Sequence, residues 1–279
     1  MVKDRDVLIQ EVDTASKNWR QGDSVLGEHW FVYRFDPQRP LTSDSVNIAY
    51  ENNNISESEV KGFVIVTQTC DIVRTCKTRS FIELVPLVKV DTKDLNAIQK
   101  CRQPQYAYIS GVAEHNLVAD LDRVMTVEKA VILGWQRIQG CKNDQETRAL
   151  GQALARKRIR FAFPDEFNQL MNKLQDKIKE KHNKQESQEG KALRSLREIR
   201  VCAEPSWDSP EVQITLWFIR HEEQNLFENK TWNQFLEKWL DLIPESEHFK
   251  VDGVVTSLED ITAKDYVESD PLDLDHLSS

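Results

Sequence analysis

The amino-acid sequence predicts an α+β protein of two domains, a small β-barrel or strongly bent sheet in residues 1–140 and a helical and α+β domain in residues 141–279. Four or five strand-like segments precede the first clear helical segment, a succession that is typical of a small barrel. The second half alternates helical and strand-like segments and has an aromatic, apolar set of residues of its own. The length of 279 residues is sufficient for two cores.

The strand-like segments of the first half are rich in aromatic and β-branched residues and are bounded by turn residues. Residues 7–16 are expected to form a short helix or strand, and the polar residues 51–60 a surface loop. Thr126 is a suitable N-cap for a helix over residues 127–138. The expected strands cover residues 24–26, 29–35, 63–67, 80–88 and 106–110.

The segment between Gly62 and Arg74 gives the strongest evidence in the sequence for a buried strand that ends in a functional site. Residues 63–66 are all apolar, as in a strand that is buried on both faces. In a strand with one solvent-exposed face, apolar and polar residues alternate. Strand ends are where folds commonly place functional groups, so the polar residues that follow this strand are the first candidates for a site. They are Gln68, Thr69, Cys70, Asp71 and Arg74.

The second half begins with a predicted helix over residues 144–158 and a second one from Pro164. The second helix has one apolar stripe, formed by Phe167, Leu170, Met171, Leu174 and Ile178. Residues 179–191, rich in Lys, Gln and Glu, are predicted to be a mobile or solvent-bridging linker. Beyond it the sequence predicts helices over residues 191–197, 231–242 and 259–267 and strands over residues 198–203, 212–220 and 250–256.

The net charge of −9 is unevenly distributed along the chain. It is −2 for residues 1–140, +6 for residues 141–200 and −13 for residues 201–279. Solvated helix faces and a soluble acidic tail account for this pattern. Alternatively, the basic segment contacts phosphate, and the acidic end shields it or repels nucleic acid from other surfaces.

Several classes of protein do not fit this composition. No apolar stretch approaches the roughly 20 residues that cross a bilayer, and the charged start lacks the apolar region of a secretory signal. The five cysteines have neither the spacing of a zinc motif nor that of a disulfide framework, and the nine glycines form no phosphate-binding loop. We therefore expect a cytoplasmic protein with no membrane contact, no metal and no cofactor.

Three short motifs resemble, in order, those of MazF/PemK-type toxins. They are Gln21-Gly22-Asp23, the apolar strand 63–66 that runs into residues 67–71, and residues 82–87. The resemblance covers residues 19–90 and implies an SH3-like barrel and a metal-independent ribonuclease, in which the RNA 2′-hydroxyl attacks its own phosphate.

Two features of this sequence depart from the pattern of the family. Val88 stands where the family has Thr or Ser, and an insertion separates Gly22 and Asp23 from the central strand.

The resemblance also implies which residues act. Arg74 or Arg79 matches the arginine that follows the central strand of the family, and this chemistry needs a cation near the phosphate and a group that positions or moves a proton. The candidate catalytic residues are therefore Arg74, Arg79, Cys70 and Asp71, with Gln68 and Thr69 as RNA-binding residues. Cys70 beside Asp71 could instead be the nucleophile of a protease or transferase, or a buried structural cysteine.

A second candidate RNA-binding set lies where cations and aromatic residues interleave, as they do in proteins that bind single-stranded nucleic acid. The alternative is a helix end whose cations satisfy the terminal carbonyl groups, followed by a core strand that buries the aromatic rings. The set consists of Arg156, Lys157, Arg158 and Arg160, with Phe161 and Phe163.

The leading hypothesis is a component of a bacterial toxin or antiviral-defence system that binds or cleaves RNA without a metal ion. The alternative is a non-catalytic protein-interaction module, in which a degenerate barrel and the acidic tail bind a partner protein. A third hypothesis is a magnesium-dependent nuclease. It would use Asp120 and Asp122, which share one face of a strand, although capping or turn roles also fit these residues.

Overall fold

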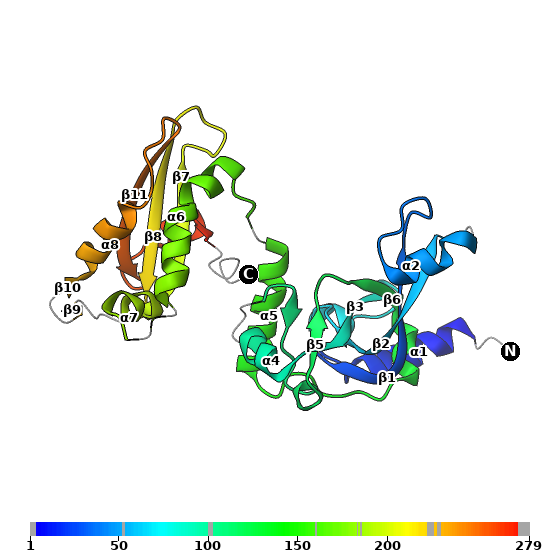
Figure 1. Ribbon diagram of the computed structural model, residues 1–279. Coiled ribbons are helices and arrows are strands. Elements are labelled where there is room, and N and C mark those ends of the chain that lie inside the picture. The colour runs from blue at the N-terminus through cyan, green and yellow to red at the C-terminus, as the bar shows by residue number, and fades with distance from the viewer. Residues whose placement is uncertain are drawn as a thin grey trace. The chain divides into compact units, whose positions relative to one another are not determined.

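The computed structural model describes residues 4–51, 54–99, 103–159, 161–182, 184, 186–221, 226–227 and 230–272. The chain is α+β, as predicted, and forms two compact units, Met1–Ile159 and Arg160–Ser279, each with a main sheet of its own (Figure 1). The boundary lies after residue 159 rather than after residue 140. Within the described ranges there is no helix long and apolar enough to span a bilayer.

The first unit is built on one antiparallel sheet with the strand order β1-β2-β3-β5-β4, in which β6 also pairs with β3. Its strands are β1 (Ser24–Arg34), β2 (Ile55–Ile65), β3 (Phe81–Lys89), β4 (Tyr106–Ala107), β5 (Leu117–Asp120) and β6 (Met125–Glu128). Its helices are α1 (Arg5–Ser16), α2 (Ser43–Ile48), η1 (Ala49–Glu51), α3 (Thr69–Ile72), α4 (Thr92–Gln99), η2 (Ala113–His115), η3 (Lys129–Gly134) and α5 (Asp144–Ile159). Pairing among the described strands does not close the sheet into a barrel.

Residues 63–65 form the end of β2 and Val66 follows directly; all four side chains are buried, on both faces of the strand, which confirms the prediction made for this segment. Phe63 and Ile65 belong to one apolar cluster, whereas Val64 and Val66 belong to another. Leu150 of α5 is part of the second cluster. Because α5 buries its apolar face in this core, the helix belongs to the first unit, which is why the boundary comes later than the sequence predicted.

Two predictions for the first half are wrong. The segment 51–60 is not a loop throughout, because β2 begins at Ile55 and its alternation turns Ser56 and Val60 inward. The segment 127–138 is not an α-helix, because its start belongs to β6 and the 3-10 helix η3 follows. Thr126 pairs with Glu83 of β3, and pairing with a neighbouring strand outweighs the local capping signal.

Gly62 allows β1 and β2 to bend sharply. It pairs with Leu26, has φ +148°, and a Cβ atom at this position would lie 2.0 Å from the carbonyl oxygen of Val25. The pairing register shifts between Leu26 and His29, immediately beyond the bend. The bend separates the part of the two strands that joins β3 from a distal ribbon, defined here as residues 29–34 and 55–60.

The second unit has a four-stranded sheet with the order β11-β8-β7-β12. β8 and β11 are parallel and are connected through α8, whereas the other pairs in this sheet are antiparallel. The strands are β7 (Leu196–Glu204), β8 (Val212–Arg220), β9 (Leu226–Phe227), β10 (Lys230–Thr231), β11 (Phe249–Ser257) and β12 (Asp270–Pro271). The helices are α6 (Asp165–His182), α7 (Gln188–Ser195), α8 (Trp232–Leu240) and α9 (Ala263–Val267).

The apolar stripe predicted from Phe167 to Ile178 is buried along α6, in one core with β8 and α8. Most of the described residues of the predicted linker over residues 179–191 belong to helices. α6 continues to His182, and α7 begins at Gln188 and buries Ala192 and Leu193 in the same core. The predicted acidic tail reaches β12 and the buried Leu272, and its remaining residues, 273–279, lie outside the described ranges.

His248 connects the start of β11 to Glu166 of α6 and to Ser209 through its two ring nitrogens. Its Nδ1 lies 2.9 Å from Oε2 of Glu166 and its Nε2 lies 2.9 Å from the carbonyl oxygen of Ser209. Both partners are acceptors, so both ring nitrogens donate only when the imidazole is charged. The hydrogen bond to the Glu166 carboxylate, followed by the one to Ser209, raises the pKa of His248 above its ordinary value.

We therefore expect the free energy of unfolding to decrease as pH rises from about 6.5 through the higher pKa of the folded state, because the proton then leaves the native protein. The measurement is urea unfolding between pH 5.5 and 9, compared with His248→Gln. The variant should lack the decrease in the free energy of unfolding that His248 causes, since glutamine does not titrate. Identical pH profiles for the two proteins would contradict the assignment.

Candidate nucleic-acid interface

The chain turns from the buried end of β2 directly into a polar surface. Gln68 lies just before α3, a single helical turn in which the amides of Asp71 and Ile72 bond to the Gln68 carbonyl at 2.9 and 3.0 Å. Ile72 is buried in the core and anchors the turn. The neighbouring side chains of Cys70 and Asp71 therefore remain at the surface.

Three of the four predicted catalytic residues lie together. Asp71 Oδ1 is 3.4 Å from Nη1 of Arg74 and 3.7 Å from Nε of Arg79, and both arginine side chains are 57% exposed. Cys70 is also exposed, so it is not a buried structural cysteine. Its sulfur lies 3.6 Å from Oε1 of Gln68, an arrangement that provides no base for a nucleophile.

A buried lysine that the sequence analysis missed holds this loop. Lys129, at the start of η3, is 1% exposed, and its ammonium donates to the carbonyl oxygens of Asp71, Ile72 and Arg74 at 2.8, 2.9 and 2.8 Å. Burial lowers the pKa of Lys129. A cation at this position completes the hydrogen bonding of the carbonyl groups at the C-terminal end of α3.

α1 holds the next part of the loop through Asp13. Its carboxylate accepts a hydrogen bond of 2.8 Å from the amide of Cys76. Burial raises the pKa of Asp13, but hydrogen bonds from Thr75 and Cys76 outweigh this effect and bring it below its usual value. Burial and the neighbouring Asp13 raise the pKa of the Cys76 thiol, so this cysteine is not an activated nucleophile.

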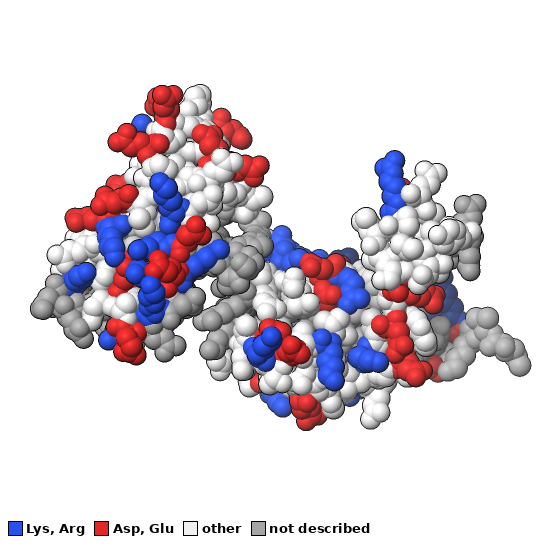
Figure 2. All heavy atoms as spheres, viewed as in Figure 1, with Lys and Arg blue, Asp and Glu red and all other residues white. Residues whose placement is uncertain are grey.

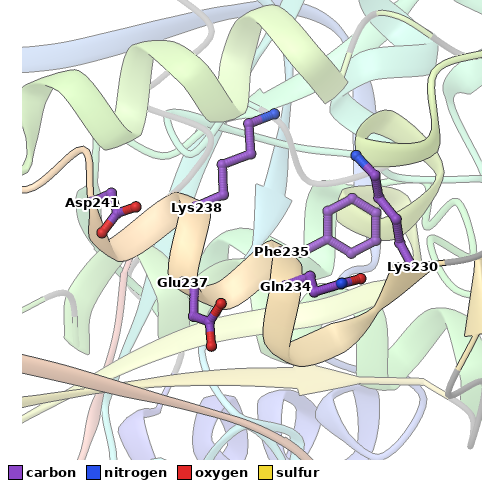
Figure 3. Close-up of a pocket in the computed structure, with 6 residues that line it drawn as sticks. All are labelled: Lys230, Gln234, Phe235, Glu237, Lys238 and Asp241. Atoms are coloured by element: carbon purple, nitrogen blue, oxygen red, sulfur yellow. The ribbon is translucent and has the colours of Figure 1, made fainter.

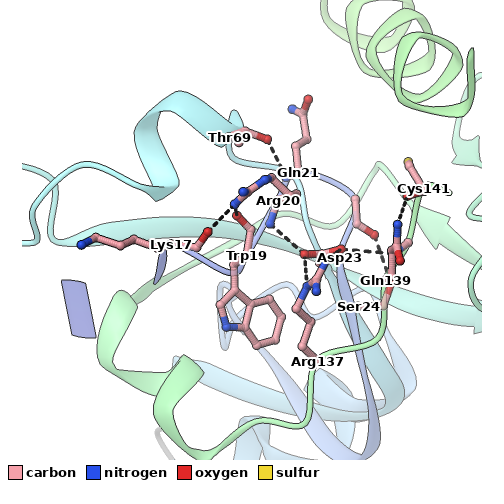
Figure 4. A network of polar contacts seen from close by, with 12 residues as sticks. Lys17, Trp19, Arg20, Gln21, Asp23, Ser24, Thr69, Arg137, Gln139 and Cys141 are labelled. Atoms are coloured by element: carbon pink, nitrogen blue, oxygen red, sulfur yellow. Dashed lines mark hydrogen bonds and ion pairs between the residues drawn. The ribbon is translucent and has the colours of Figure 1, made fainter. Parts of the chain in front are cut away.

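The turn at residues 20–23 packs beside α3 (Figure 4). The buried carboxylate of Asp23 accepts from Nε of Arg137 at 2.5 Å and from the backbone amides of Arg20 and Gly140 at 2.7 and 3.2 Å. The amide of Gln21 donates to Oγ1 of Thr69 at 3.1 Å. The predicted binding residue Thr69 therefore links the turn to the loop.

Basic side chains of α5 also lie near the end of β2, although α5 is far from β2 in the sequence. Nη2 of Arg158 lies 3.2 Å from Oε2 of Glu83, and the amide of Glu83 donates to Oγ1 of Thr67 at 2.6 Å. Lys157 pairs with Asp122, and Arg156 is half-buried. Thr67 thus lies between the loop that carries Arg74 and the ion pair of Arg158.

The second predicted set is divided between the two units. Arg160 lies outside the described ranges. The rings of Phe161 and Phe163 are 5.2 Å apart, and both pack against Trp207 in the second unit, at 5.7 and 5.4 Å. Both rings are half-buried in an aromatic cluster, and residues 161–164 do not form the strand that the structural alternative predicted.

The residues of the magnesium hypothesis are occupied in ion pairs. Oδ2 of Asp120 lies 2.8 Å from Nε of Arg123, and Asp122 pairs with Lys157. The described part of the chain has no group of three or more His, Cys, Asp and Glu side chains that could hold a metal ion.

The second unit has a surface depression of about 400 Å³ along α8 (Figure 3). Its residues are Lys230, Gln234, Phe235, Glu237, Lys238 and Asp241. Lys238 is engaged by the buried carboxylate of Glu189, at 2.5 Å, which also accepts from Nε1 of Trp239. This arrangement connects α7 to α8.

The sequence matches no protein-family model and no curated protein.

Proposed function

We propose that the first unit is an SH3-like barrel of the MazF/PemK type that binds single-stranded RNA across the end of β2, as a component of a bacterial toxin or antiviral-defence system. The observation that supports it best is the convergence of exposed guanidinium groups from two segments. Arg74 and Arg79 surround Asp71, while Arg158 reaches Glu83 beside Thr67. Exposed ion pairs contribute only about 0–1 kcal/mol, so phosphate groups can replace these carboxylates.

Two further contacts favour a barrel. Ser24 at the start of β1 pairs with Ile138, far along the chain, and the amide of Val32 lies 3.4 Å from the sulfur of Met125 in β6. The first strand therefore returns toward the last strands of the sheet, as closure requires.

Binding is the function that this geometry supports best. Cleavage through the 2′-hydroxyl would need a base, and the Asp71 carboxylate is paired with Arg74 and Arg79. Among the described side chains, no hydrogen bond or ion pair joins a histidine to Asp71, Arg74 or Arg79. Cleavage without a metal ion remains an expectation of the family resemblance.

Replacement of Arg74 and Arg79 together by alanine is expected to weaken binding of a fluorescein-labelled single-stranded RNA about tenfold, equivalent to about 1.4 kcal/mol. The slope of log affinity against log salt should fall by about 1.4, since each lost phosphate contact removes about 0.7 for a single strand. Fluorescence anisotropy in EDTA measures both quantities.

The matched control is Lys93→Ala, which removes an exposed cation from α4. An equal loss in the control, or unchanged binding in the double variant, would contradict the proposed site. The same reactions on a denaturing gel test cleavage. RNA products formed in EDTA by the wild type and absent from the double variant would add catalysis to binding.

A further inference from the structure

Phe81 is exposed beside the proposed RNA site and takes no part in the core. It is the first residue of β3, and its side chain is 59% exposed, whereas the next residue, Ile82, is buried. Phe81 belongs to neither apolar cluster of the first unit, and its ring stacks on no other described aromatic or cationic side chain. Single exposed apolar residues are common on protein surfaces, so the surroundings of this one decide whether it has a function.

Both parts of the proposed RNA site adjoin Phe81. Arg79, which pairs with Asp71, precedes it by two residues. Glu83 follows it by two residues, on the same face of the strand, and pairs with Arg158 of α5. Along the strand, the aromatic ring therefore lies between exposed guanidinium groups from two segments. Interleaved cations and aromatic rings are typical of proteins that bind single-stranded nucleic acid.

An unpaired carboxylate lies across from the ring. Glu128 of β6 is the cross-strand partner of Phe81. Because the amide of Lys129 donates to the carbonyl oxygen of Ser80, the next pair along, Phe81 and Glu128, is a non-hydrogen-bonded pair, in which side chains are closest. Glu128 is exposed, and its carboxylate makes no cap hydrogen bond to η3 and no ion pair with any described residue.

Charge alone does not select a ligand here. The side chains around Phe81 carry both signs, and basic and acidic side chains are also mixed on the face of the first unit that Figure 2 shows. A nucleotide fits such a mixture, because its phosphate pairs with a cation, its base stacks on an aromatic ring and the edge of its base forms hydrogen bonds. An ionised carboxylate only accepts hydrogen bonds, so it matches a base edge that carries N–H donors.

We propose that Phe81 stacks against one unpaired base of the bound RNA and that Glu128 accepts hydrogen bonds from the edge of that base, with guanine preferred. Guanine offers two neighbouring N–H donors to the two carboxylate oxygens. Uracil presents its single N–H between two carbonyl oxygens, which a carboxylate repels. The inference rests on the proposed function, in which Arg74, Arg79 and Arg158 contact the phosphate groups.

Fluorescence anisotropy in EDTA compares a fluorescein-labelled nonauridylate with the same RNA carrying guanine at its central position. The full wild-type chain should bind the guanine-containing RNA about tenfold more tightly, and Glu128→Ala should bind both RNAs equally. Phe81→Ala should weaken binding of the guanine-containing RNA about tenfold or more. It should leave the slope of log affinity against log salt unchanged, since no charge is lost. Tyr50→Ala removes another exposed aromatic side chain of the first unit and should alter none of these quantities.

Equal affinity of the wild type for the two RNAs, a guanine preference that persists in Glu128→Ala, or unchanged affinity in Phe81→Ala would overturn the proposal. If Phe81→Ala does not fold, the guanine preference of Glu128→Ala decides. RNA binding that depends on Arg74 and Arg79 but not on Phe81 would leave the proposed function intact and remove this inference alone. Absence of RNA binding by the wild type would overturn both.

Discussion

Replacement of Asp23 by alanine is expected to destabilise the first unit by about 3 kcal/mol, since loss of one partner of a buried ion pair leaves the remaining polar groups without a partner. Asp23 is 2% exposed, and its two oxygens accept from Arg137 and from the amides of Arg20 and Gly140. In Asp23→Ala, Arg137 is one-third exposed and can hydrogen-bond to water instead, whereas the Gly140 amide is buried and cannot.

Urea unfolding followed by circular dichroism measures this effect on the full chain. Asp36→Ala provides the control, because Asp36 is exposed and, within the described ranges, its carboxylate accepts a hydrogen bond from the amide of Gln38 alone. It should change the free energy of unfolding by less than about 0.5 kcal/mol. Arg137→Ala should be milder than Asp23→Ala, as the carboxylate keeps its two amide donors. A change below about 1 kcal/mol in Asp23→Ala would show that water replaces the lost bonds.

The sequence predicted those features of the fold that local patterns determine. The apolar run of residues 63–66 defined the strand that is buried on both faces, and the stripe from Phe167 to Ile178 defined the buried face of α6. β6 was not predictable in the same way. Its residues resemble a capped helix start, and they become a strand only because β3 offers a partner.

The same distinction applies to the candidate site. Asp71, Arg74 and Arg79 lie within nine residues of each other, so the sequence could place them on one loop. Arg158 is 75 residues from Glu83, and Lys129 is 58 residues from Asp71. No local pattern connects such pairs. A lysine in particular is ordinarily assigned to the surface, and only the fold reveals that this one is buried.

Replacement of Lys129 by methionine is expected to destabilise the first unit by about 3 kcal/mol, because three carbonyl groups lose their donor and methionine fills the space without replacing it. The gain from no longer burying a charge offsets part of this loss. Since those carbonyls belong to residues 71–74, amide hydrogen exchange should become faster in the loop, and affinity for RNA should fall together with it.

Lys77→Met is the control, as Lys77 is an exposed lysine of the same loop whose side chain pairs with Asp6 and with no other described residue. It should alter neither stability nor exchange at residues 69–76. A buried charge often adds little to the stability of a core, since its replacement by an apolar residue frequently leaves the free energy of unfolding unchanged. Unchanged stability with faster loop exchange and weaker RNA binding would therefore mean that Lys129 serves the geometry of the loop. If exchange and RNA binding are both unchanged, the loop holds its conformation through Asp13 and Ile72, and Lys129 has no part in the site.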